Sequence, residues 1–77
     1  MAIAYVLIST DPGKEYDVYN QLLKVPEVRD LMPLFGEYDL ICKIDGPDLD
    51  KLGQTILGQI RSIPGVANTR TLTATKL

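Results

Sequence analysis

Gly36-Glu37-Tyr38-Asp39, followed by Leu40-Ile41-Cys42-Lys43-Ile44, places a turn with a carboxylate and a phenol at the head of an apolar strand. Turns held on a rigid sheet are common places for recognising small ligands. The plainer interpretation is that Gly36 supplies a positive φ, Asp39 bonds its own backbone, and the segment only connects two strands. The elements on either side of the turn help to decide between these interpretations.

Upstream of the turn, residues 2–9 are almost entirely apolar or β-branched, which predicts a strand. Both faces of this strand are apolar, one carrying Ile3, Tyr5 and Leu7 and the other Ala4, Val6 and Ile8. Such a strand is expected to be covered on two sides.

Two helices are predicted, one before the turn and one after it. Asp11-Pro12-Gly13 marks the start of the first, with Asp11 as cap and Pro12 in the first turn, and this helix runs to about Lys24. The second opens after Asp45-Gly46-Pro47-Asp48 and ends at Pro64-Gly65. Apolar stripes of helical period give each helix a buried side: Val18, Leu22 and Val25 in the first, and Leu49, Leu52, Ile56, Ile60 and Ile63 in the second.

Three further strands complete the element order, over residues 28–35, 40–44 and 66–75. Pro33 cannot donate a ladder bond, so its strand is expected at a sheet edge or bulge. The last strand alternates, with Ala67, Thr69, Thr71 and Thr73 facing one way and Asn68, Arg70, Leu72 and Ala74 the other.

The order strand, helix, strand, strand, helix, strand predicts an α+β fold, the ferredoxin-like βαββαβ plait, with a four-stranded antiparallel sheet and two helices on one face. Right-handed crossovers place the first and third strands centrally and the other two at the edges. The opposite sheet face would then expose apolar side chains, as interfaces do. We therefore predict a dimer in which two sheets face each other, and consider a ring of such dimers.

Composition narrows the class of protein. A lone domain of 77 residues buries only roughly 60 to 65 percent of its unfolded surface. Cys42 is the one cysteine and histidine is absent, so neither a disulfide framework nor a zinc site can stabilise the fold, and oligomerisation is the remaining common remedy. The apolar run at residues 3–8 is too short for a bilayer, and Met1-Ala2 begins no signal peptide. We expect a soluble cytoplasmic protein.

The charge pattern argues against direct binding of nucleic acid. The formal net charge is −2 and the eight basic residues are scattered along the chain. A protein that binds DNA or RNA directly usually carries a clustered basic patch. No membrane partner is expected either.

Four short segments occur in a characteristic order on the predicted plait: Val25-Pro26-Glu27-Val28, Gly36-Glu37-Tyr38-Asp39-Leu40, Ile63-Pro64-Gly65-Val66 and Thr69-Arg70-Thr71. Through them the whole chain resembles the RAM (regulation of amino-acid metabolism) domain, the effector-binding half of the Lrp/AsnC feast/famine transcription regulators. No helix-turn-helix precedes these segments. The resemblance therefore implies a stand-alone RAM protein, with residues 1–77 as one domain, in place of a direct transcription factor.

In the resembled family, small ligands, typically amino acids, sit between neighbouring dimers. Carried over by position, the contacting residues would be Gly36, Tyr38, Asp39, Leu40, Thr71 and Thr73. Asp39 could accept from the ligand's ammonium, and the Gly36 region offers backbone amides with little steric cover. The threonine hydroxyls could donate or accept, and Tyr38 could wall the side-chain pocket or contact the neighbouring subunit.

Each assignment has a structural alternative. Thr69, Thr71 and Thr73 could simply form a β-branched strand face. Tyr16 and Tyr19 read as packing residues, Cys42 as a small core or interface residue, and Arg70 as a solvated residue or an interface ion-pair partner. Asp48 and Asp50 point to different helix faces, so no metal and no other cofactor is predicted.

Three classes of function remain. The leading hypothesis is a ligand-sensing, oligomerising module that binds an amino acid or a related effector and co-assembles with full-length Lrp/AsnC regulators. The second is a purely structural assembly domain without a ligand. The third is a small enzyme, since this plait hosts many activities. Against an enzyme, the chain has no histidine and no cysteine pair, and the ordinary pKa values of tyrosine and aspartate are poorly matched to acid–base catalysis.

Overall fold

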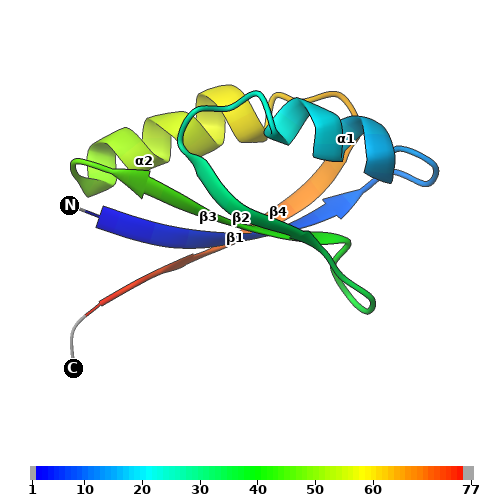
Figure 1. Ribbon diagram of the computed structural model, residues 1–77, viewed down its shortest axis with the longest axis horizontal. Helices are drawn as coiled ribbons and strands as arrows, with labels where there is room; N and C mark the ends of the chain where they lie inside the picture. Colours follow the sequence, from blue (N-terminus) through cyan, green and yellow to red (C-terminus); the bar gives the residue numbers. More distant parts are fainter. Residues whose placement is uncertain (1, 76–77) are drawn as a thin grey trace.

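The architecture is a two-layer α+β plait in which two helical segments cover one face of a sheet (Figure 1). The computed structural model describes residues 2–75. Its sheet has the strand order β2-β3-β1-β4, and all neighbouring strands are antiparallel. The predicted plait is therefore confirmed, including its central first and third strands. The elements in chain order are β1 (Ala2–Thr10), α1 (Glu15–Leu22), β2 (Val28–Pro33), β3 (Leu40–Gly46), α2 (Leu49–Thr55), the π-helical turn η1 (Ile56–Ile60) and β4 (Val66–Thr73).

The sheet face beneath the helices carries the core. Val6 of β1 pairs with Cys42 of β3 on one side and Thr71 of β4 on the other, so residues of the same parity share a face. On this face Ala4, Val6, Ile8, Leu40, Cys42 and Ile44 are all buried. The helical segments and the turn after them cover these residues with Val18, Leu22, Leu52, Ile60 and Ile63. The predicted division of the β1 residues between two faces is confirmed, with Ala4, Val6 and Ile8 together on this one.

The opposite face, which we call the open face, has no helix over it among residues 2–75 (Figure 1). Tyr5 pairs with Lys43 and Leu72, and Leu7 pairs with Ile41 and Arg70, so these side chains lie on this face. Tyr5 and Leu72 are 40% and 52% exposed. Apolar side chains therefore face outward from the central strands and from the edge of the sheet.

The first helix is shorter than predicted. Helix α1 begins at Glu15, its N-cap position is Lys14, and no side chain caps it. Gly13 has a φ of 81°, a left-handed conformation that cannot belong to a right-handed helix, so Asp11-Pro12-Gly13 forms a separate turn. The prediction that Asp11 caps the helix is wrong for this reason. Val18 and Leu22 are buried as expected, and buried Val25 follows the helix end.

The second helix departs from a regular α-helix. It starts at Leu49, after the N-cap Asp48, whose carboxylate accepts a hydrogen bond of 2.8 Å from the Lys51 N–H. From Ile56 to Ile60 the chain forms a π-helical turn, which shifts the angular spacing of the apolar stripe. Leu52 and Ile60 are buried, whereas Leu49 is 61% exposed. The predicted stripe is thus correct at Leu52, Ile60 and Ile63 and wrong at Leu49.

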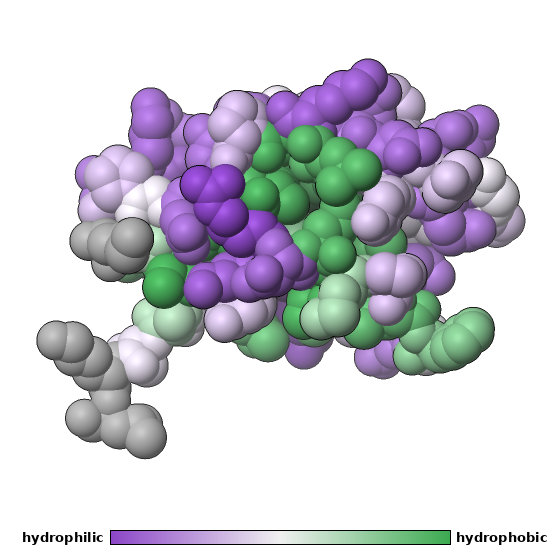
Figure 2. Space-filling model, in the orientation of Figure 1, coloured by the Kyte–Doolittle hydropathy of each residue, from purple (hydrophilic) through white to green (hydrophobic). Residues whose placement is uncertain are grey.

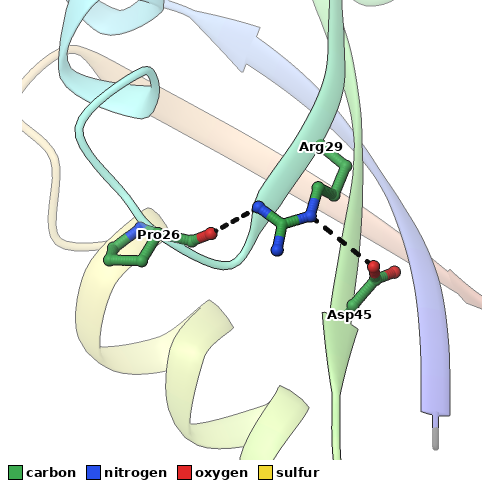
Figure 3. A network of polar contacts seen from close by, with 3 residues as sticks. All are labelled: Pro26, Arg29 and Asp45. Atoms are coloured by element: carbon green, nitrogen blue, oxygen red, sulfur yellow. Dashed lines mark hydrogen bonds and ion pairs between the residues drawn. The ribbon is translucent and has the colours of Figure 1, made fainter.

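The strand boundaries shift by a few residues. Strand β2 ends at Pro33, at the edge where a proline is tolerated, and contains a bulge at which Asp30 has a φ of 50°. Strand β3 continues to Gly46, which pairs with Ala2, so Asp45-Gly46 does not break it as predicted. Figure 3 shows Arg29 spanning this edge, with 2.8 Å from its guanidinium to the Pro26 carbonyl and 3.7 Å to the Asp45 carboxylate.

Candidate functional site

The turn between β2 and β3 is fastened to the end of β1. The Asp39 N–H donates to the Ile8 carbonyl at 2.9 Å. The Asp39 carboxylate oxygen Oδ2 accepts from both the Thr10 N–H, at 2.8 Å, and the Thr10 hydroxyl, at 3.1 Å. Oδ1 takes part in neither bond. Asp39, the predicted acceptor for an ammonium group, is therefore held in a defined orientation by its bonds to Thr10.

Gly36 supplies the positive φ that the sequence pattern predicts at this turn. Its φ is 126°, and a Cβ built there would meet nothing within 4 Å. The constraint at this position is therefore conformational and not steric, because no side chain or backbone approaches it. Open space beside the Gly36 backbone is compatible with a ligand that reaches its amides.

One hollow lies between α1 and the turn, and we call it the helix-side hollow. Its volume is about 700 Å³, and it is lined by Glu15, Tyr16, Tyr19, Pro33, Leu34, Phe35, Asp39 and Leu40. Figure 2 shows hydrophobic residues in a band from the helix layer down to the sheet and again at the end with the β2–β3 turn. Asp39 and Leu40 are the predicted site residues that line this hollow.

A second, polar hollow lies where the turn meets β4. It measures about 340 Å³ and is lined by Ser9, Glu37, Tyr38, Asn68, Thr69 and Arg70. Tyr38 is the predicted site residue found here. Neither Glu37 nor Arg70 has an ion-pair partner within residues 2–75.

The two predicted threonines lie in a third place, a groove between α2 and β4. This groove measures about 290 Å³, and Thr71 and Thr73 line it together with Leu49 and Leu57. In the sheet, Thr71 and Thr73 stand level with Val6 and Ala4, whereas Leu40 stands level with Ile8. Within a single subunit, the six predicted residues therefore lie in separate places and do not line one pocket.

Sequence reasoning did not assign Glu15, Leu34 or Phe35 to a site, and it gave Tyr16 and Tyr19 a packing role. Tyr19 does pack against the core, but Tyr16 is 77% exposed, so the packing prediction is wrong for Tyr16. One sequence feature points to this hollow, the pair Leu34-Phe35. These are two large apolar residues next to a glycine turn, where polar residues are usual.

Other reactive groups give no second site in the described part of the chain. Burial raises the pKa of the Cys42 thiol from 9.0 to about 11, so at neutral pH it is a protonated core residue, as predicted. Residues 2–75 contain no group of three or more side chains suited to a metal ion. No helix in this range is long and apolar enough to cross a membrane.

This fold places the chain in the ferredoxin-like α+β class, and comparison with known proteins identifies the family. The family model described as the Lrp/AsnC ligand binding domain matches residues 3–76. The chain belongs to this family. The resemblance seen in the sequence is thereby confirmed.

Among curated relatives, the HTH-type transcriptional regulator FL11 of Pyrococcus horikoshii is 34% identical over 74 residues, covering 96% of this chain and 48% of the regulator. The chain thus spans about half the length of the curated relatives it matches. The crystal structure of FFRP-DM1 is 40% identical with a TM-score of 0.93, covering 97% of this chain and all of that one. The L-Met complex of the Neisseria meningitidis regulator NMB0573 shares the fold, at 21% identity and a TM-score of 0.87 over 97% of this chain and 50% of that one.

Proposed function

We propose that this chain is a ligand-sensing, oligomerising module that binds an amino acid or a related small molecule. The observation that carries the proposal is the turn: Asp39 is held in one orientation by Thr10, in a member of a ligand-binding family. A carboxylate with one free oxygen suits an ammonium group, because the resulting hydrogen bond is charge-assisted. The Neisseria meningitidis regulator, whose structure is an L-Met complex, supports an amino acid as the class of ligand.

The second part of the proposal is assembly through the open face. Met32 pairs with Ile41 and so shares this face with Tyr5 and Leu72. The three side chains are between 40% and 56% exposed, and exposed apolar patches of this kind usually mark interfaces. Two subunits that pack sheet against sheet would cover them. We extend the proposal to contacts between such dimers, which would bring Thr71 and Thr73 of one subunit to the turn of another and so complete the site that one subunit divides.

We further propose that the module acts indirectly in regulation, by co-assembling in the cytoplasm with full-length Lrp/AsnC regulators, and that it is not an enzyme. The curated relatives that support this are HTH-type transcriptional regulators of about twice its length. The chain's net charge of −2 favours a role through protein partners over direct contact with DNA.

A thermal-shift screen against the twenty amino acids, with light scattering on the same samples, tests the function. A ligand that binds only the folded state raises the melting temperature by mass action, so we expect a selective rise for a few amino acids. An assembly of constant size with no shift at millimolar ligand would instead favour a purely structural domain, whose specific support is the exposed open face.

Asp39→Asn is the matching single-residue test. Asparagine keeps an oxygen that accepts from Thr10 but removes the charge, so we expect the fold to persist while calorimetry shows weaker amino-acid binding. Asp17→Asn, the same change at an exposed position of α1, is the control and should leave binding unchanged. Equal affinity of Asp39→Asn and wild type would contradict the ammonium site.

A further inference from the structure

We propose that the helix-side hollow recognises a primary amine with a branched aliphatic or aromatic body, and that it does so without contacting a carboxylate of the ligand. The eight lining residues include two carboxylates, Glu15 and Asp39, and no lysine or arginine. An ammonium group is therefore the complementary charge, whereas a carboxylate would meet only like charges. The remaining lining is aromatic or apolar, which suits an apolar body.

Both carboxylates are held by the protein in a way that leaves oxygen atoms for a ligand. Glu15 uses Oε1 to accept a hydrogen bond of 3.0 Å from the Gly13 N–H. Asp39 uses Oδ2 for its two bonds from Thr10. The second oxygen of each side chain takes part in none of these bonds. Each carboxylate at the hollow thus keeps an acceptor atom that a primary ammonium, with its three N–H donors, can use.

The walls supply the apolar part of the recognition. Phe35 is fully exposed at the turn and Tyr16 is 77% exposed on α1, so both rings border the hollow without being part of the core. Aromatic rings attract cations over their faces and also cover apolar groups. The volume of about 700 Å³ lies within the range of roughly 300 to 1,000 Å³ typical of small-molecule sites.

This inference deepens the proposed function and rests on it through Asp39, the residue that both share. The inference adds a ligand class. The hollow binds the ammonium group and the apolar body of the ligand and does not contact the ligand's carboxylate. Amino acids with leucine-like or phenylalanine-like side chains then bind through their amine end. Amines that lack the carboxylate altogether bind at least as well.

The probes are 3-methylbutylamine and 2-phenylethylamine, compared with 4-methylpentanoate and 3-phenylpropionate, which keep the body and exchange the charge. Titrations followed by calorimetry and by amide chemical shifts of the whole chain measure binding and locate it. We expect both amines to bind, with shifts at residues of α1 and the turn. The two carboxylates should bind at least about tenfold more weakly, since each would face two like charges.

Variants separate this hollow from its neighbours. Glu15→Gln and Asp39→Asn should each weaken amine binding by about tenfold, a loss expected for one charge-assisted bond. Glu37→Gln is the matched control, because it makes the same change on the same turn but lines the polar hollow. Phe35→Ser should weaken both amines while leaving the assembly size unchanged.

Three outcomes of these probe and variant comparisons would overturn the proposal, in addition to a failure of the amines to bind. They are equal binding of amines and carboxylates, an effect of Glu37→Gln as large as that of Glu15→Gln, and a Phe35→Ser variant that changes assembly size but not amine binding. The last result would mean that the hollow is an interface between subunits. If amino acids bind in an Asp39-dependent way while the amines do not, this inference fails and the proposed function stands. Amine binding without any response to amino acids would contradict the proposed function and leave only the amine site of this inference.

Discussion

The two faces of the sheet are built from the same strands, but the side chains of one face are buried and those of the other are largely exposed. On the covered face, Leu40, Cys42 and Ile44 of β3 are buried almost completely beneath the helices. On the open face, the apolar side chains of Tyr5, Met32 and Leu72 are 40% to 56% exposed. Because side chains alternate with a period of two along each strand, a substitution can change one face and leave the other intact.

The two faces contribute to stability in different ways, one within the chain and one through association between chains. The covered face is completed within the chain, because Val18, Leu22, Leu52 and Ile60 fill the space above it. Its contribution to folding is therefore independent of protein concentration. Any gain from covering the open face depends on association, and so depends on concentration. Substitutions on opposite faces of one strand can test this separation directly.

The largest effect is expected for Ile44→Ala on the covered face. Ile44 is fully buried against the helices, and such truncations cost about 2 to 5 kcal/mol because they leave a cavity. Urea denaturation at two protein concentrations measures the loss, which should be the same at both. Ile41→Ala, on the same strand but half-buried on the open face, is the control. A larger loss for Ile41→Ala would reverse the roles assigned to the two faces.

The burial of Cys42 on the covered face predicts that the free energy of unfolding depends on pH. Burial raises its pKa from 9.0 to about 11, so the unfolded chain loses the thiol proton at lower pH than the folded one. The thiol's contribution is fully present below pH 9 and is lost as the pH rises through 11, a decrease of about 2 to 3 kcal/mol.

The readout for Cys42 is the difference in free energy of unfolding between wild type and Cys42→Ala across this pH range, which cancels contributions that the two proteins share. Alkylation by iodoacetamide at pH 8 should also be slow until the chain unfolds. Rapid alkylation of the folded protein would show that this face admits water.

The division into two faces could be predicted from the sequence, because alternation in β1 and β4 depends only on local geometry. Ile3, Tyr5 and Leu7 share the open face with Arg70 and Leu72, as their spacing requires. The helix details could not be predicted in this way. The π-helical turn at residues 56–60 is not encoded by a helical repeat, and the left-handed Gly13 belongs to a Pro-Gly turn that a helix-start pattern does not distinguish from a cap.

The candidate site was predictable only in part. The turn with Gly36 and Asp39 has a recognisable pattern, and its positive φ follows from the glycine. The link from Asp39 to Thr10 joins residues 29 positions apart, and no local pattern announces it. Glu15 and Phe35 meet at one hollow only because the plait folds α1 over the turn. Contacts between residues far apart in the sequence thus form the part of the site that the spacing of residues along the chain does not predict.

A smaller effect is expected for Tyr5→Lys on the open face. Tyr5 lies directly opposite Lys43, so the new side chain places like charges side by side in the centre of the proposed dimer face. We expect roughly 10- to 100-fold weaker association, or ~1.4 to 2.7 kcal/mol. Sedimentation measures it, with circular dichroism to confirm folding. Tyr16→Lys, on the helix side, should leave the dimer intact. A dimer unaffected by Tyr5→Lys would exclude the open face as its interface.

The smallest effect concerns the turn, which divides between the faces: Tyr38 lines the polar hollow and Asp39 the helix-side hollow. Thr10→Val removes the hydroxyl bond of 3.1 Å to Asp39 and keeps the shape and the N–H bond. The expected loss is about 1 kcal/mol, measured by urea denaturation.

Ser9→Ala is the control for Thr10→Val, because it removes the hydroxyl of the neighbouring residue, which lines the polar hollow instead. If the bond orients Asp39 for a ligand, Thr10→Val should weaken amine binding more than its effect on folding explains, since the carboxylate would no longer be held in one orientation. Faster hydrogen exchange at the Asp39 amide would accompany that loss. A variant with unchanged exchange and unchanged binding would mean that the backbone N–H of Thr10 alone holds the turn.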